Sequence, residues 1–121
     1  MNTHTDHVGQ RARVSASIQL LKVMKDARAD VIVLTGDFNA RPESEEMRMI
    51  TADTELGLMD ASVGISGSFH NFGRCVPWKC DYIFSNRSAL ECRLIEDTPV
   101  DGVYLSDHNP IVASILLNQE D

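Results

Sequence analysis

Six polar side chains of types that take part in hydrolysis are spread along the chain, at His4, Asp37, Asn39, Asp81, Asp107 and His108. A carboxylate such as that of Asp107 is the oxygen ligand that Mg²⁺ or Mn²⁺ prefers, and the adjacent imidazole of His108 can take up a proton near pH 7. If Asp81 lies close in space, it could hold that imidazole in one tautomer, as the acid of a hydrolase triad does. These residue types suit metal-assisted attack of water on a phosphoester.

The other three side chains suit the handling of a water molecule and of developing charge. Asp37 and Asn39 could accept hydrogen bonds from an attacking water and orient it, and His4 could donate to negative charge on phosphorus. Each residue also has a structural alternative, because Asx residues often close turns and histidines often lie exposed on the surface. The chemistry therefore depends on the folded chain bringing the six side chains together.

A buried strand leads into Asp37 and Asn39. Residues 31–35 are mostly apolar and β-branched, Gly36 permits a turn that other residues resist, and Pro42 prevents simple continuation of the strand. In open α/β sheets, ligands collect outside the carboxyl ends of the strands. We therefore expect this corner to lie at one rim of a sheet.

Two helices are predicted to flank that sheet. Apolar residues recur at helical spacing from Gly9 to Arg28 and predict an amphipathic helix. Its expected buried positions are Val14, Ile18, Leu21 and Met24. A second helix is expected to begin at Ser44, because acidic residues follow it at the positive end of the helix dipole, and to end at Gly57.

Further strands are predicted at residues 1–4, 58–61, 81–85, 90–96 and 111–117, with a polar loop at 101–110. The sequence contains no repeat or interdomain linker, so residues 1–121 are expected to form a single domain. This order of elements predicts an α/β (α+β) fold with a layered sheet.

Composition narrows the classes of partner. Eighteen acidic residues against eleven basic ones give a net charge of −7, which disfavours binding of nucleic acid through phosphate contacts alone. A polyanionic substrate would then need bound cations. No segment has the length and apolar character of a membrane span or the pattern of a signal peptide, so the sequence leaves the localisation open.

Three cysteines, Cys75, Cys80 and Cys92, lack the spacing of a structural zinc site. A bond between Cys75 and Cys80 would satisfy spacing alone. We favour reduced thiols, because the number of cysteines is odd.

Four short segments in this order resemble the endonuclease/exonuclease/phosphatase superfamily, the DNase I-like metal-dependent phosphoesterases. They read NTH at 2–4, GDFNA at 36–40, DYIF at 81–84 and SDHNP at 106–110. The resemblance implies a sandwich of two mixed β-sheets with helices outside, of which this chain would form the half with one mixed β-sheet and flanking helices. It also implies that His4 contacts the scissile phosphate, that Asp37 and Asn39 position the nucleophile, and that Asp107 binds the metal.

The resemblance further implies that His108, oriented by Asp81, contacts the phosphate or assists proton transfer. The segment 68–70 resembles a substrate-side segment of some small bacterial members, which makes His70 a candidate substrate-binding residue. Thr5 and Cys80 stand where a leucine and an aliphatic residue are usual. The expected cofactor is Mg²⁺ or Mn²⁺, and the expected substrate is a phosphate ester.

The chain resembles only the C-terminal half of that family. Members are about twice as long, and the other half would supply a metal-binding glutamate, an early asparagine and the second sheet. Residues Glu43, Glu45 and Glu46 lie beyond the corner on the second predicted helix and offer no substitute. We therefore expect weak metal binding, and self-association through an apolar sheet face that soluble monomers avoid exposing.

Two alternatives remain at this stage. A half-domain could keep the family fold without turnover and serve as an interaction module. The segment 2–7 is also one residue away from the His-x-His-x-Asp-His pattern of metallo-β-lactamase-fold zinc hydrolases. That reading lacks the first histidine, and no histidine lies between His7 and Asp37 to complete the zinc ligands.

Overall fold

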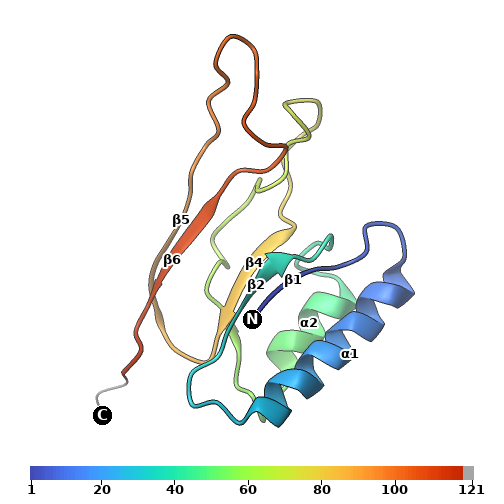
Figure 1. Cartoon of the computed structure of the whole chain (residues 1–121), viewed down its shortest axis with the longest axis vertical. Helices are drawn as coiled ribbons and strands as arrows, with labels where there is room; N and C mark the ends of the chain where they lie inside the picture. The colour runs from blue at the N-terminus through green and yellow to red at the C-terminus, as the bar shows by residue number, and fades with distance from the viewer. Residues whose placement is uncertain (119–121) are drawn as a thin grey trace.

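A computed structural model describes residues 1–118 as three layers, with two helices on one side of a four-stranded sheet and a β-hairpin on the other (Figure 1). The strands run in the order β1-β2-β4-β3, with β1 parallel to β2 and with β4 antiparallel to β2 and β3. Their bounds are Asn2–His4, Val33–Asp37, Asp81–Ser85 and Met59–Asp60 for β1, β2, β4 and β3. The predicted α/β fold with a mixed sheet and flanking helices is confirmed.

The last two strands form a sheet of their own. β5 (Ala89–Leu94) and β6 (Ile111–Ile115) pair with each other in antiparallel fashion, and both end earlier than the sequence suggested. Strand β2 begins two residues later than predicted and ends two residues later, at Asp37. The reason is pairing, because β1 and β4 keep hydrogen-bond partners beside β2 as far as Asp37.

Helix α1 (Gln10–Ala27) covers one face of the sheet, but its buried side differs from the prediction. Leu21 and Met24 are buried as expected, whereas Ile18 is 54% exposed and Ser17 is buried in its place. The hydroxyl of Ser17 donates to the carbonyl of Glu46, so contact with the second helix turns this face of α1 inward. Within residues 1–118, neither helix combines the length and the apolar composition that crossing a membrane requires.

Helix α2 (Glu45–Ala52) begins where predicted but is shorter. The side chain of Ser44 accepts a hydrogen bond from the backbone N–H of Met47 and caps the helix. The predicted end at Gly57 is wrong, because the helix stops at Ala52 and a separate turn follows. Gly57 adopts a positive φ of 62° within that turn.

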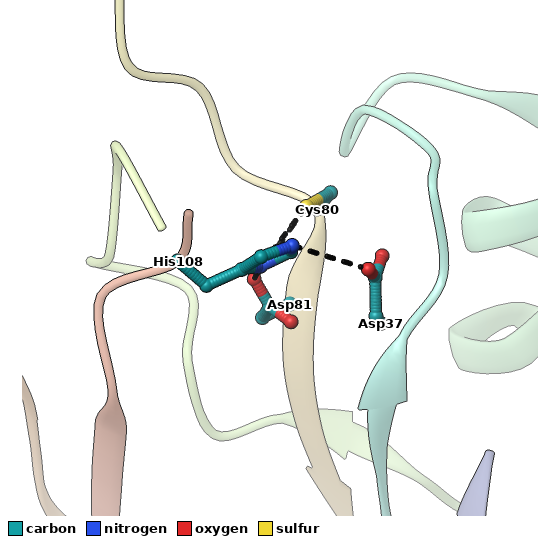
Figure 2. A group of neighbouring side chains, drawn as sticks. All are labelled: Asp37, Cys80, Asp81 and His108. Carbon is teal, nitrogen blue, oxygen red and sulfur yellow. Dashed lines mark hydrogen bonds and ion pairs between the residues drawn. The ribbon is translucent and has the colours of Figure 1, made fainter. Parts of the chain in front are cut away.

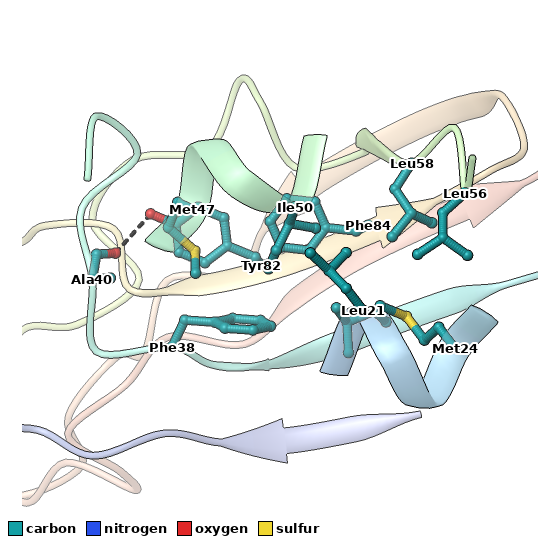
Figure 3. Close-up of a cluster of buried hydrophobic side chains, with 11 residues drawn as sticks. Leu21, Met24, Phe38, Ala40, Met47, Ile50, Leu56, Leu58, Tyr82 and Phe84 are labelled. Carbon is teal, nitrogen blue, oxygen red and sulfur yellow. Dashed lines mark hydrogen bonds between the residues drawn. The ribbon is translucent and has the colours of Figure 1, made fainter. Parts of the chain in front are cut away.

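A cluster of buried apolar side chains, three of them aromatic, fills the space between the helices and the sheet (Figure 3). The rings of Tyr82 and Phe84 stack with centroids 5.5 Å apart, and Phe38 meets both edge-on at 5.7 Å. The hydroxyl of Tyr82 donates to the carbonyl of Ala40 at 2.7 Å. The chain segment that follows β2 is therefore held in place by buried rings, and this fixes the position of Asp37.

The opposite face of the sheet is more open and more polar than the predicted apolar face. The hydroxyl of Thr35 donates to the side-chain oxygen of Asn2 on this face. Ile83 is 8% exposed, while exposed apolar side chains lie on the hairpin, at Leu90 and Val112. Alternation along β2 and β4 places the polar groups on this face, because their neighbours in sequence enter the core.

Candidate active site

Strand register places three predicted residues in one row across the open face. His4 pairs with Asp37, and Asp37 pairs with Asp81, on the neighbouring strands β1, β2 and β4. Directly paired residues project to the same side of a sheet. The Nε2 atom of His4 lies 3.3 Å from Oδ2 of Asp37. The row therefore follows from the pairing that the core imposes on these strands.

His108 completes this group from the loop that precedes β6 (Figure 2). Its Nδ1 atom lies 2.7 Å from Oδ2 of Asp81, and its Nε2 atom lies 3.4 Å from Oδ2 of Asp37. The ring of Phe69 packs against the imidazole with centroids 5.1 Å apart. Both ring nitrogens of His108 thus face carboxylates, and a protonated ring can donate to both.

A buried serine that the sequence did not identify joins this loop to β4. The backbone carbonyl of Ser68 accepts from the N–H of Asn109 at 2.7 Å. Its hydroxyl oxygen accepts from the N–H groups of Cys80 and Asp81, at 3.0 and 3.1 Å. Ser68 therefore couples the position of Asp81 to that of His108. Only its place beside His70 in the segment 68–70 gave a sequence signal.

Asn39 lies just beyond β2 and has a left-handed conformation with φ of 47°. Its backbone N–H donates to Oδ1 of Asp37 at 2.9 Å, and its side-chain amide donates to the carbonyl of Thr5 at 2.7 Å. Asn39 therefore closes a turn, which is the structural alternative considered above. Both contacts use N–H groups, and neither uses its side-chain oxygen.

The chain matches a known protein family over most of its length. A sequence model described as the Endonuclease/Exonuclease/phosphatase family matches residues 2–108. The chain belongs to the endonuclease/exonuclease/phosphatase family. A search of curated proteins gave no match. The match disfavours the alternative of a metallo-β-lactamase-fold zinc hydrolase.

Solved structures show the same fold. An endonuclease/exonuclease/phosphatase from Bacteroides vulgatus is similar with a TM-score of 0.82 and 30% identity over 95% of this chain and 48% of that one. A mannosyl-6-phosphatase from Bacteroides thetaiotaomicron has a TM-score of 0.78 and 23% identity over 96% of this chain and 50% of that one. The human Nocturnin catalytic domain, with bound sulfate, is similar with a TM-score of 0.70 and 20% identity over 95% of this chain and 46% of that one. The chain thus spans about half the length of these relatives.

Asp107, the predicted metal ligand, lies on the same rim of this family fold but at its outer side. Its side chain is 43% exposed, and Oδ1 lies 3.9 Å from Nε2 of His108. The carboxylates of Asp37 and Asp107 therefore both approach that nitrogen. Asp107 is not one of the four residues whose donor atoms all lie within 4.8 Å of one another, which are Asp37, Cys80, Asp81 and His108.

His70, the predicted substrate-binding residue, is only 5% exposed. Its Nδ1 atom accepts from the N–H of Gly73 at 3.2 Å, and its ring lies 4.9 Å from that of Tyr104. Its backbone N–H donates to the carbonyl of Asp107 at 2.9 Å. The structure thus links His70 to the site through the main chain.

Cys80 is a second residue that the sequence did not identify as part of the site. Its thiol is almost fully buried, 3.5 Å from Oδ2 of Asp81 and 3.9 Å from Nδ1 of His108. Burial, reinforced by the negative charges of Asp81 and Asp37, raises the pKa of this thiol far above its ordinary value. Its position directly before Asp81 was the available signal. All three cysteines are free in the structure.

The oxygen donors at the rim fit a hard divalent ion. Asp37 and Asp107 each lie within 4 Å of Nε2 of His108, although Asp107 is outside the group of donor atoms that lie within 4.8 Å of one another. Carboxylate oxygens are the ligands that Mg²⁺ and Mn²⁺ take. The nearby glutamate of α2 is engaged elsewhere, because Glu46 is buried and its Oε1 lies 2.8 Å from Nε of Arg13. The rim of this chain therefore offers few of the ligands that such an ion needs.

Proposed function

We propose that this rim carries out the hydrolysis of phosphate esters by an activated water. The observation that carries the proposal is the placement of His108 between Asp81 and Asp37, with His4 at the far end of the same row. Such an arrangement combines an oriented imidazole with carboxylates that can hold a water. Membership of a family of phosphoesterases and nucleases supports it.

Each residue has a distinct part in the proposed reaction. Asp81 accepts a hydrogen bond from Nδ1–H of His108 and fixes its tautomer, so that Nε2 faces the reacting groups. Asp37, positioned by its contact with the N–H of Asn39, orients the attacking water. His4, whose side chain is 72% exposed, donates to a phosphoryl oxygen as negative charge develops there.

A divalent ion would be held by Asp107, and Asp37 is the second carboxylate near the same nitrogen of His108. When bound, Mg²⁺ or Mn²⁺ neutralises charge on the phosphate and on the carboxylates. Two carboxylates leave most positions of an octahedral ion to water, so we expect weak binding by this chain. The chain otherwise repels phosphate, since acidic residues exceed basic ones eighteen to eleven over the full sequence.

Small phosphate esters are favoured over long nucleic acid as substrates. The net charge of −7 opposes an extended contact with a polyanion, whereas one metal ion can offset the charge of one phosphate group. A solved relative is a mannosyl-6-phosphatase, and another binds sulfate. Both are consistent with a site that accommodates a compact tetrahedral anion.

The test is hydrolysis of bis(p-nitrophenyl) phosphate and p-nitrophenyl phosphate with and without Mg²⁺. We expect Mg²⁺-dependent release of nitrophenolate that is lost in His108→Ala and in Asp37→Ala. The matched control is His7→Ala, because His7 is an exposed histidine near the same end of β1. Turnover in the His108→Ala and Asp37→Ala variants equal to that of the wild-type chain would refute the site assignment.

A non-catalytic or assembly role is the second candidate, since the chain spans about half of its solved relatives. We propose that the chain self-associates through the face opposite the helices. An open groove of about 500 Å³ runs over this face, and its lining includes Thr35, Ile83 and Ile111. The same lining includes His4, Asp37 and Asp81, so a second copy of the chain seated here would cover the rim and remove the side chain of Ile111 from water.

Sedimentation velocity tests this second proposal. We expect the wild-type chain to form a dimer or larger species, and Thr35→Lys to shift it toward monomer by placing a charge in the groove. Val23→Lys is the matched control, because Val23 is half exposed on the outer side of α1. A wild-type chain that sediments as a monomer at all concentrations would contradict self-association.

A further inference from the structure

A group of mixed donors surrounds Nδ1 of His108 (Figure 2), whereas Asp107 lies near the other ring nitrogen, Nε2. The sulfur of Cys80 lies 3.5 Å from Oδ2 of Asp81 and 3.9 Å from Nδ1 of His108. The same oxygen and nitrogen lie 2.7 Å from each other. One sulfur, one carboxylate oxygen and one imidazole nitrogen therefore surround a common point.

These donors have the chemistry and the spacing of a tetrahedral zinc site. Zinc bonds of about 2.0 to 2.3 Å to nitrogen, oxygen and sulfur place neighbouring ligands about 3.5 Å apart. Both distances that involve the sulfur are near this value. The third distance is shorter because it is now a hydrogen bond, and it would open when an ion replaces the shared proton.

The other ring nitrogen of His108 has the partner that a zinc-bound histidine requires. A metal-bound imidazole usually donates its second N–H to a carboxylate, which fixes the ring. Nε2 of His108 lies 3.4 Å from Oδ2 of Asp37. Coordination through Nδ1 would thus leave Nε2–H directed at Asp37.

We propose that Cys80, Asp81 and His108 bind a thiophilic divalent ion such as Zn²⁺, with Asp37 orienting the imidazole. Thiolate is a soft ligand that zinc accepts and that magnesium avoids, so this site differs in selectivity from the oxygen site at Asp107. The ion reaches it from the side of Asp81 and His108, whose side chains are 20% and 24% exposed.

Zinc binding would change the protonation of Cys80 and His108. The thiol of Cys80 releases one proton to solvent as its sulfur becomes a ligand, and His108 remains neutral with its proton moved from Nδ1 to Nε2. His108 then no longer donates to Asp81. If the proposed function holds, a zinc-loaded rim cannot handle protons as described above, so zinc inhibits hydrolysis. Zinc binding itself does not depend on that function.

Titration of the whole chain with Co²⁺, a spectroscopic substitute for Zn²⁺, tests the site without an activity assay. We expect one equivalent to give a thiolate-to-cobalt charge-transfer band and the strong visible bands of tetrahedral cobalt, both removed by added Zn²⁺. Cys80→Ser should abolish the charge-transfer band and weaken zinc binding by more than the roughly 100-fold that loss of an outer-shell partner causes. Asp81→Asn should weaken zinc binding in the same direction.

A double variant, Cys75→Ser with Cys92→Ser, leaves Cys80 as the single thiol and guards against a misfolded Cys80→Ser protein. The charge-transfer band should persist in it unchanged. Absence of the band from the wild-type chain, its loss in the double variant, or its survival in folded Cys80→Ser would each overturn the proposal. Failure of the phosphate-ester assay alone would not, because the cobalt spectrum reports binding only.

Discussion

The two faces of the four-stranded sheet solve different problems with alternate residues of the same strands. On the helix side, Leu34, Tyr82 and Phe84 are at most 2% exposed and form a dry cluster. On the other side, the side chains of Asp37 and Asp81 keep 16% and 20% of their surface exposed. Apolar packing fixes the register of β2 against β4, and that register in turn sets the carboxylates side by side.

Packing of the core therefore determines where the site residues lie. A shift of one residue between β2 and β4 would turn every side chain of one strand to the opposite face. Such a shift would bury Asp81 and expose Tyr82, at a high cost in free energy. The stability of the helix side and the chemistry of the open side should therefore respond to different substitutions.

The largest expected effect is on the open face. Asp81→Asn preserves the shape of the side chain but removes the carboxylate that fixes the tautomer of His108. We expect hydrolysis to fall by roughly 10,000-fold, which corresponds to about 5 kcal/mol, with little change in the free energy of unfolding. Steady-state kinetics and urea unfolding measure the two quantities. Asp26→Asn, on the exposed side of α1, is the control.

The helix face should show the reverse pattern. Phe84→Ala removes a buried ring that contacts both Phe38 and Tyr82. We expect the free energy of unfolding to fall by about 4 kcal/mol. Thr35→Ala, on the open face of β2, should cost less than about 1 kcal/mol. Similar losses for both variants in urea unfolding would remove the distinction between the faces.

These two regions also differ in how far the sequence predicts them. Strand β4 has the bounds that the residue pattern predicts, and the polar residues at strand ends lie on one rim because strand ends leave charges near water. The contribution of Ser68 and Cys80 could not be predicted, since it depends on loops distant in sequence. The burial of Ser17 in place of Ile18 likewise depends on how α1 meets α2.

The buried ion pair between Arg13 of α1 and Glu46 of α2 should have a smaller, pH-dependent effect on the free energy of unfolding. Burial alone would raise the pKa of Glu46, but hydrogen bonds from Arg13, from the backbone and from Gln10 outweigh it and hold the pKa below the ordinary 4.5. Glu46→Gln should lower the free energy of unfolding by about 3 kcal/mol at neutral pH, because Arg13 then lacks its partner.

The sign of the pH dependence follows from the lowered pKa. Stabilisation by Glu46 is present above pH 4.5 and is lost as the pH falls through the pKa of the folded state. The stability difference between wild type and Glu46→Gln should therefore shrink in acid. Glu45→Gln, an exposed neighbour, is the control. A difference that stays constant from pH 7 to about pH 3 would contradict this account.

A smaller effect is expected at Ser68, which supports Asp81 and His108 on the open side. Ser68→Ala leaves the buried N–H groups of Cys80 and Asp81 without their acceptor. We expect a loss of about 2 kcal/mol in unfolding free energy. Hydrolysis should fall as well, because Asp81 and His108 lose their shared support. Ser66→Ala, at an exposed position two residues earlier, should change neither quantity.

Binding of inorganic phosphate in the presence of Mg²⁺, followed by NMR of the imidazole resonances, tests the shared rim most directly. The chain has four histidines. We predict that the resonances of His4 and His108 shift together with one dissociation constant, while that of exposed His7 does not move. Phosphate that shifts His7 alone, or that leaves both His4 and His108 unchanged at saturating concentrations, would contradict a common phosphate site.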